Sequence, residues 1–187
     1  MNEDKILQTY KTCCATQTDI NEHLPILRKY SSQCAHITEM GVRSVFSTWG
    51  FLAGLVDRGG GTLHSIDCTH PSSCGGHGTG LGPVYDVCDG EKIEFVFFEE
   101  DTLKIDIQKT DLLFIDTDHV YKQLKAELEL HAPKVKKYII LHDTSGPTGV
   151  DLKPAIDEFL ESNEEWRTLE HFTNNNGLTI LGKQKYE

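Results

Sequence analysis

The stretch that decides the fold is "DLLFIDTDHVYKQL", residues Asp111 to Leu124. Its apolar beginning is typical of a buried strand, and from Val120 onward apolar residues recur at the spacing of one helical face. Three ionisable residues, Asp116, Asp118 and His119, fall in the short turn between the two elements. A strand that passes directly into a helix is the repeating unit of a sheet with parallel strands.

The same alternation of strand and helix extends over the chain from about residue 36. Strands are predicted at residues 35–40, 62–67, 92–101, 111–116 and 135–143, with helices at 47–56, 83–88 and 119–132. Asp151 and Pro154 predict the opening of a further helix that runs through residue 162. The segment "WRTLEHFTNNNGLTILGK" predicts two strands joined by an Asn-Gly turn, an antiparallel hairpin at one edge of the sheet.

Composition limits the classes of protein that fit. The chain has 187 residues, which favours one domain over residues 1–187, and 38% are hydrophobic and 25% charged. The longest apolar runs fall short of the roughly 20 residues needed to cross a bilayer, and the start lacks the apolar core of a signal peptide, so a cytoplasmic protein is expected. The net charge of -11, with basic residues scattered, argues against nucleic acid as a partner.

Two segments have more than one interpretation. Residues 1–33 contain helical patterns at 6–14 and 20–30, which would cover one face of the sheet or form a lid over a site. The six cysteines are expected to be free thiols. The loop "CTHPSSCGGH" brings Cys68, His70, Cys74 and His77 close in sequence, but the spacing differs from standard zinc motifs and favours a plain loop over a zinc site.

Ionisable side chains follow the ends of five predicted strands, where an open parallel sheet binds its ligands. A missing side chain at Gly41 would let a ligand approach the backbone, and Asp67 ends the second strand, where a carboxylate can accept hydrogen bonds from ribose hydroxyls or cap a helix. The segment "GVRSVFS" lacks the three glycines of a dinucleotide site. A nucleoside cofactor without phosphates is therefore indicated, of which S-adenosylmethionine is the common example.

The segments "HITEMGVRSVFSTWGFLAG", "LHSID", "LLFIDTDHVYKQLKAELELHAPKVKKYIILHDT" and "NNNGLTIL" resemble class I S-adenosylmethionine-dependent methyltransferases, in particular small metal-assisted sugar O-methyltransferases. The resemblance extends from about Asp19 to the end. It implies an α/β Rossmann-like three-layer sandwich with a seven-stranded, mostly parallel sheet and an antiparallel last strand. The cofactor-binding residues that it implies are Glu39, Gly41, Val42, Ser47, Asp67, Glu100, Asp101, Thr102 and Asp116.

The opening stretch then acquires a chemical role. Asp116 and Asp143 end neighbouring strands, as two ligands of a divalent metal (Mg or Mn) would, and His142 is a third ligand or faces the cofactor. His119 is the expected base because imidazole titrates near neutrality, with Asp118 as second choice. The alternative is that Asp118 only caps a helix that begins at His119.

The expected acceptor is a hydroxyl of a sugar or another small molecule or glycan, and a homo-oligomer is left open. The loop "SGPTGV" after the fifth strand is interpreted as a wall of the acceptor site or as a connector. A metal-independent methyltransferase and a nucleoside-binding module without turnover are the competing hypotheses, whereas a dehydrogenase using NAD lacks its glycines.

Overall fold

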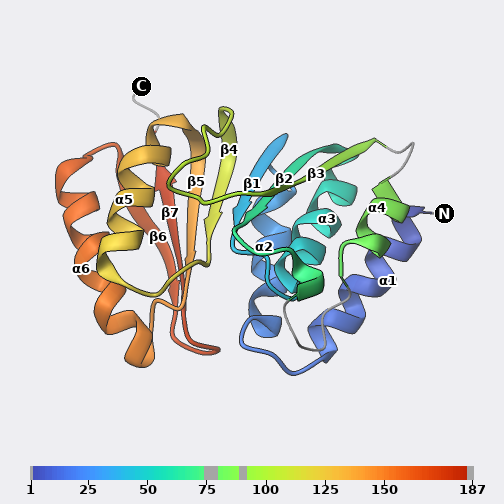
Figure 1. Ribbon diagram of the computed structural model, residues 1–187. Helices are drawn as coiled ribbons and strands as arrows, with labels where there is room; N and C mark the ends of the chain where they lie inside the picture. Colours follow the sequence, from blue (N-terminus) through green and yellow to red (C-terminus); the bar gives the residue numbers. More distant parts are fainter. Residues whose placement is uncertain (1, 74–79, 89–91, 185–187) are drawn as a thin grey trace.

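The computed structural model describes residues 2–73, 80–88 and 92–184, and its core is one mixed sheet of seven strands (Figure 1). The strand order is β3-β2-β1-β4-β5-β7-β6. Strands β1 to β5 pair in parallel, and β7 lies antiparallel between β5 and β6. The predicted Rossmann-like fold with an antiparallel last strand is confirmed. The strands are β1 (His36–Met40), β2 (Gly61–Asp67), β3 (Ile93–Glu99), β4 (Thr110–Ile115), β5 (Val135–His142), β6 (Trp166–Phe172) and β7 (Leu178–Lys183).

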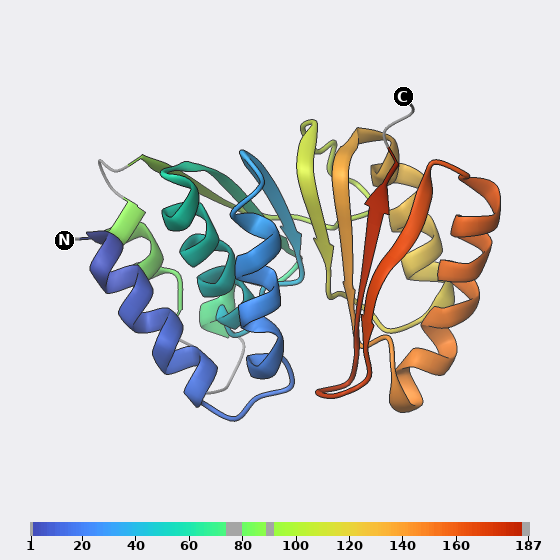
Figure 2. The same cartoon turned by 180° about the vertical axis from the view of Figure 1, so that it is seen from behind.

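Helices cover both faces of the sheet, as Figures 1 and 2 show from opposite sides. Four of them pack into one hydrophobic core with β1, β2 and β3, and α5 and α6 form a second core on the other face. The helices are α1 (Asn2–Ala15), α2 (Leu24–Ser31), α3 (Phe46–Arg58), α4 (Gly82–Cys88), α5 (Tyr121–His131) and α6 (Gly146–Ser162). Short 3-10 turns lie at η1 (Asn21–His23), η2 (Pro71–Ser73) and η3 (Ala132–Lys134).

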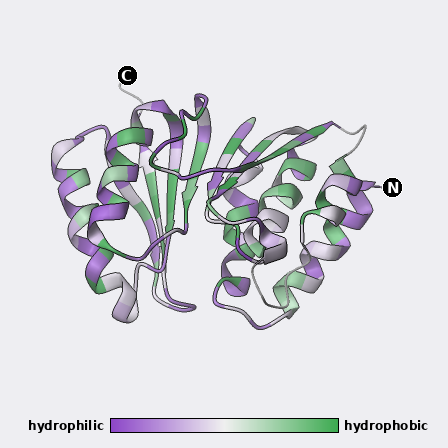
Figure 3. Cartoon of the chain, in the orientation of Figure 1, coloured by the Kyte–Doolittle hydropathy of each residue, from purple (hydrophilic) through white to green (hydrophobic). Residues whose placement is uncertain are grey.

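The burial of the apolar central strands explains why the sheet forms. Every residue of β4 is buried, as expected for a strand covered by helices on both faces, and the central strands are largely hydrophobic in Figure 3. In the outer strand β6, Trp166 is buried and the other residues are exposed or partly exposed. The carboxyl ends of the parallel strands therefore form one edge at which the following turns meet.

The C-terminal hairpin is confirmed, with a longer turn than an Asn-Gly dipeptide alone provides. Residues 173–177 join β6 to β7, and Asn175, Asn176 and Gly177 have φ angles of 48°, 66° and 94°. Asparagine and glycine adopt this left-handed region more readily than other residues do. The turn therefore reverses the chain with little strain.

Two helix starts differ from those predicted. Helix α5 begins at Tyr121 rather than His119, and Val120, expected on the buried face, is extended and 49% exposed. Helix α6 begins at Gly146 instead of Asp151, so the "SGPTGV" loop is mostly its first turns and Pro154 lies inside the helix. Ser145 directly before the helix and Pro147 in its first turn are residues usual at a helix start, and Gly149 and Leu152 in the added turns are buried.

The N-terminal segment packs into the same hydrophobic core as α3 and α4. Helices α1 and α2 both pack against α3, and the ring of Tyr30 on α2 meets Tyr138 of β5 edge to face at 4.9 Å. Within the described residues, none of the helices is long and apolar enough to cross a membrane.

Candidate functional site

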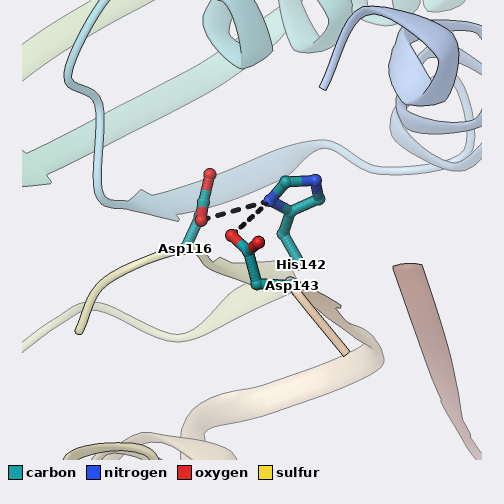
Figure 4. Close-up of side chains that lie close together, drawn as sticks. All are labelled: Asp116, His142 and Asp143. Atoms are coloured by element: carbon teal, nitrogen blue, oxygen red, sulfur yellow. Dashed lines mark hydrogen bonds and ion pairs between the residues drawn. The ribbon is translucent and has the colours of Figure 1, made fainter. Parts of the chain in front are cut away.

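Three side chains converge where β4 and β5 end. Asp116 directly follows β4, His142 is the last residue of β5 and Asp143 comes next. Nδ1 of His142 lies 2.9 Å from Oδ2 of Asp143 and 3.3 Å from Oδ1 of Asp116, and the three groups point toward one another (Figure 4). One potential ligand atom from each lies within 4.8 Å of the others. Among the described residues, this is the one cluster of three such side chains that could hold a metal ion.

His119 adds a second imidazole to this cluster. Its Nε2 lies 2.9 Å from Oδ2 of Asp143 and 3.5 Å from Oδ1 of Asp116. Hydrogen bonds to Asp116 and Asp143 raise the pKa of His119 to about 10. The sequence suggested a base that titrates near neutrality; in the protein without a bound cation, His119 is instead an imidazolium.

Burial and charge act in opposite directions on the other three groups. Burial alone would lower the pKa of His142, but its hydrogen bonds to Asp116 and Asp143 raise that pKa to about 10. Burial would raise the pKa of both carboxyls, yet the hydrogen bonds from His119 and His142 hold the pKa of Asp116 below its usual value and that of Asp143 well below it. Two ionised carboxylates thus face two protonated imidazoles.

The orientation of His142 is set by the backbone. Its Nε2 lies 3.0 Å from the carbonyl oxygen of Asp19 and 3.2 Å from that of Asn175, and carbonyl oxygens only accept hydrogen bonds. Nε2 therefore carries a proton and Nδ1 faces the carboxylates. A lone pair on Nδ1 would point at two negative oxygens, so this nitrogen requires either a proton or a cation between it and them.

Asp118 does not cap helix α5. The residue that precedes the helix is Val120, and no side-chain hydrogen bond caps the helix at this position. Asp118 contributes its backbone carbonyl, which accepts a hydrogen bond from the N–H of Val120 at 2.9 Å. The capping alternative is therefore wrong. The Asp118 side chain is exposed at the rim of the cavity described next.

A cavity of about 740 Å³ lies beside the cluster, at the carboxyl ends of β1 to β4. Seven of the residues that the sequence singled out line it: Gly41, Asp67, Glu100, Asp101, Thr102, Asp116 and Asp118. A smaller cavity of about 110 Å³ adjoins it and is lined by Val42, Ser47, Asp116, His119 and Asp143, together with Asp19 and Arg43. The two cavities share Gly41, Arg43, Asp116 and Thr117, so the cluster lies where they meet.

Glu39 lines neither cavity. Its carboxylate is buried beneath the turn after β1 and accepts hydrogen bonds from the hydroxyls of Ser47, Thr48 and Ser65. Burial raises the pKa of Glu39 to about 7. The structure therefore places Glu39 behind the site, in contact with it through Ser47.

Asp67 organises the turn after β1. Its Oδ2 accepts from the N–H groups of Val42 at 2.8 Å and Arg43 at 3.1 Å, and its Oδ1 accepts from Thr69 N–H at 3.0 Å. A carboxylate has about four acceptor positions, so roughly one stays available to a ligand.

A glycine is required at position 41 for a structural reason that the sequence did not reveal. Its φ is +84°, and a Cβ atom there would lie 1.9 Å from the carbonyl oxygen of Asp116. The absent side chain thus makes room for the turn after β4, and Gly41 also lines both cavities.

Sequence reasoning also missed two charged residues at the small cavity. Arg43 is ion-paired with Asp19 at 2.6 Å, across its mouth. The position of Arg43 directly after the glycine turn was a usable signal, whereas nothing local marks Asp19. Of the cysteine and histidine loop, Cys74 and His77 lie outside the described residues.

Comparisons with known proteins agree with this geometry. Residues 38–144, more than half of the chain, match the model of a family described as "Methyltransferase domain". None of the curated proteins matches the chain in sequence. Several solved structures share the fold at low sequence identity.

An O-methyltransferase from Bacillus cereus in complex with SAH is 14% identical, with a TM-score of 0.63 over 98% of this chain and 90% of that chain. An SAH-bound methyltransferase from Podospora anserina is 13% identical, with a TM-score of 0.62 over 97% and 88%. A methyltransferase from Geobacter sulfurreducens is 14% identical, with a TM-score of 0.63 over 97% and 90%. At these identities the likeness is one of fold.

Proposed function

This chain belongs to the methyltransferase-domain family, and from that premise we propose that it is an O-methyltransferase that uses S-adenosylmethionine and a divalent cation. The proposed acceptor is a hydroxyl of a sugar or glycan. The observation that carries the proposal is the convergence of Asp116, His142 and Asp143 beside a cavity of about 740 Å³. Two similar folds are described as bound to SAH, the demethylated form of this cofactor, which supports the choice of methyl donor.

The large cavity fits a nucleoside cofactor by its place and its polar groups. It lies at the carboxyl ends of the parallel strands, and Asp67 keeps an acceptor position for a ribose hydroxyl. The turn from Glu100 to Thr102 and the residue Gly41 line it. Val42 and Ser47 line the adjoining small cavity, and Glu39 lies behind Ser47. S-adenosylmethionine would supply an electrophilic methyl group on sulfur: attack by the acceptor oxygen would form the oxygen–methyl bond, break the sulfur–methyl bond and release S-adenosylhomocysteine.

The acidic cluster fits a divalent cation by the chemistry of its donors. Two carboxylates, with side chains 25% and 3% exposed, and the Nδ1 atom of His142 face a common point. Asp116, Asp143 and His142 would hold the ion, and a nitrogen donor favours Mn²⁺ over Mg²⁺, which prefers oxygen. Such an ion would supply Lewis-acid chemistry there: it could hold two neighbouring hydroxyls and would lower the pKa of the one to be methylated.

His119 is the proposed base, with Asp118 as the second candidate. Its Nε2 faces Asp143 from the helix side of the cluster, at the smaller cavity. Its raised pKa comes from hydrogen bonds to Asp116 and Asp143 and then from their charges, so a cation that engaged these carboxylates would return the pKa toward its ordinary value. Neutral His119 can then accept the proton of the acceptor hydroxyl at Nε2.

A sugar is the proposed acceptor because its neighbouring hydroxyls match what one cation can hold at once. A metal-independent methyltransferase of another small hydroxylated metabolite is the second candidate. One observation favours it: Nε2 of His119 and Nδ1 of His142 each lie 2.9 Å from Oδ2 of Asp143, so two imidazoles can satisfy this carboxylate by hydrogen bonds.

The test combines binding with transfer. Calorimetry should show S-adenosylhomocysteine binding, and radiolabelled methyl transfer to a panel of monosaccharides and glycans should stop with EDTA and return with Mn²⁺. Transfer that survives EDTA would support the metal-independent candidate. Binding without transfer to any hydroxylated acceptor would indicate a nucleoside-binding module, and absence of binding would contradict the proposal.

A further inference from the structure

Helix α5 carries a buried carboxylate that none of the steps above uses. Glu127 is 0% exposed, although burial of a carboxylate costs free energy unless hydrogen bonds replace its water. Its Oε1 accepts from Thr102 Oγ1 at 2.6 Å and from Gln123 Nε2 at 2.9 Å, and its Oε2 accepts from Thr117 Oγ1 at 2.8 Å. Both carboxylate oxygens are thus engaged.

The partners of Glu127 come from two different turns. Thr102 belongs to the connection after β3, whereas Thr117 follows Asp116 after β4. Thr102 is held a second time, because Nε2 of the buried His131 lies 2.7 Å from its carbonyl oxygen. Burial lowers the pKa of His131, so the ring is neutral and donates from Nε2. One helix therefore fixes both turns.

These turns are walls of the large cavity. Thr102, Thr117 and Gln123 all line it. Residues 100–109, all of which the structure describes, connect β3 to β4 through turns and extended chain without a helix. Backbone hydrogen bonds hold its start, from Glu100 N–H to the Asp67 carbonyl and from Lys104 N–H to the Asp101 carbonyl, and Ile107 anchors it in the core. The bonds of Thr102 are the side-chain ties between this connection and helix α5.

We propose that Glu127 is a positioning residue of the cofactor cavity, which holds the turn at Asp101–Lys104 and the turn at Asp116–Asp118 at a fixed separation. The part that concerns cofactor affinity rests on the proposed function. A residue that served packing alone would be apolar, since an apolar side chain of similar volume fills a core without desolvation of a charge. A carboxylate that spans two turns instead fixes their spacing, and a preformed cavity binds its ligand more tightly.

The metal cluster should not depend on Glu127. The backbone N–H of Asp116 donates to the carbonyl of Met40 at 2.8 Å, and its carboxylate faces His119 and His142. Loss of Glu127 therefore should leave Asp116 in place. This separates a local role in the cavity from a general loss of structure.

The test uses Glu127→Ala, the conservative Glu127→Gln and, as matched control, Glu129→Ala, whose side chain is 67% exposed on the same helix. For Glu127→Ala we expect S-adenosylhomocysteine affinity to fall about tenfold or more, with Mn²⁺ affinity within about threefold of the parent. Glu127→Gln should retain most of the affinity, since threonine hydroxyls can accept from an amide as well as donate to it. The control should bind as the parent does.

Hydrogen exchange of the ligand-free protein gives a readout that needs no cofactor. Glu127→Ala should speed amide exchange at residues 101–104 and 117–118 and leave Asp116 and residues 41–45 unchanged. If the parent binds no S-adenosylhomocysteine, the proposed function fails and exchange alone decides the role of Glu127.

Three results would overturn the inference: parent-like exchange in both turns, parent-like affinity in Glu127→Ala when the parent binds, or equal losses of cofactor binding, metal binding and stability. If Glu127→Ala does not fold, Thr117→Val removes one of the bonds with little change in volume. Faster exchange at residues 117–118 would then support the role, and unchanged exchange there would refute it.

Discussion

Glu39→Gln should change how the stability of the protein depends on pH. The Glu39 carboxylate is buried, and its pKa is raised from 4.5 to about 7 by that burial. A group whose folded-state pKa is raised contributes fully below its unfolded-state pKa, and its contribution is lost as pH rises through the folded-state value. The contribution of Glu39 to the free energy of unfolding should therefore be smallest above about pH 8.

The expected magnitude follows from that shift. A rise from 4.5 to about 7 corresponds to about 3 kcal/mol of unfolding free energy between the protonated and ionised limits. Glutamine stays neutral, and the hydroxyls of Ser47, Thr48 and Ser65 can rotate to meet its amide. Relative to Glu39→Gln, the parent should therefore lose about 3 kcal/mol between about pH 5 and pH 8.

Urea unfolding of both proteins across this pH range measures the difference. Glu94→Gln, which removes an exposed carboxylate from β3, controls for the loss of one negative charge. A constant difference between parent and Glu39→Gln at all pH values would refute the reasoning. Calorimetry with S-adenosylhomocysteine on the same variant tests the placement of Glu39 behind the site, which predicts affinity within about threefold of the parent.

Three further substitutions test the site. Position 143 has a φ of 56°, which asparagine tolerates, so Asp143→Asn should fold as the parent does. This variant should abolish Mn²⁺ binding in calorimetry, while its cofactor affinity stays within about threefold of the parent. Equal loss of both affinities would contradict the separation of metal and cofactor sites. His119→Ala should lower kcat by about 10²-fold or more with little change in cofactor affinity, and an unchanged rate would move the base role to Asp118. Gly41→Ala should cost about 2 kcal/mol or more in urea unfolding, because its Cβ would meet the Asp116 carbonyl. Gly59→Ala has a similar φ of +88° but no atom within 4 Å, so it should cost less, and equal losses would refute the role of the close contact.

The fold could be predicted because its signals are local. The buried run before Asp116 and the hairpin signal at residues 173–177 each specify an element, and the elements then combine by the rules of parallel sheets. Asp116, His142 and Asp143 were expected at one edge because they follow neighbouring strands, and the structure brings them together.

The features that the sequence did not predict depend on contacts between residues far apart in the chain. The pKa of His119 follows from two carboxylates on different strands, and the need for Gly41 follows from a backbone atom of Asp116. Glu127 gave one local signal, since it falls on the same helical face as buried Leu124 and Leu128. A carboxylate on an apolar face indicates buried partners, but their identity requires the folded chain.

The contacts between the N-terminal segment and the C-terminal hairpin, which meet at His142, have a consequence for the order of folding. Asn175 Nδ2 donates to the Thr18 carbonyl at 2.8 Å, and His23 Nε2 lies 3.0 Å from the Asn174 carbonyl, pairs separated by 157 and 151 residues in sequence. Contacts of such long range form late in folding, because a long loop must close first. During synthesis, the contacts that cover His142 should therefore form only after the C-terminal hairpin emerges. A nascent chain without the hairpin would leave Asp116 and Asp143 uncovered.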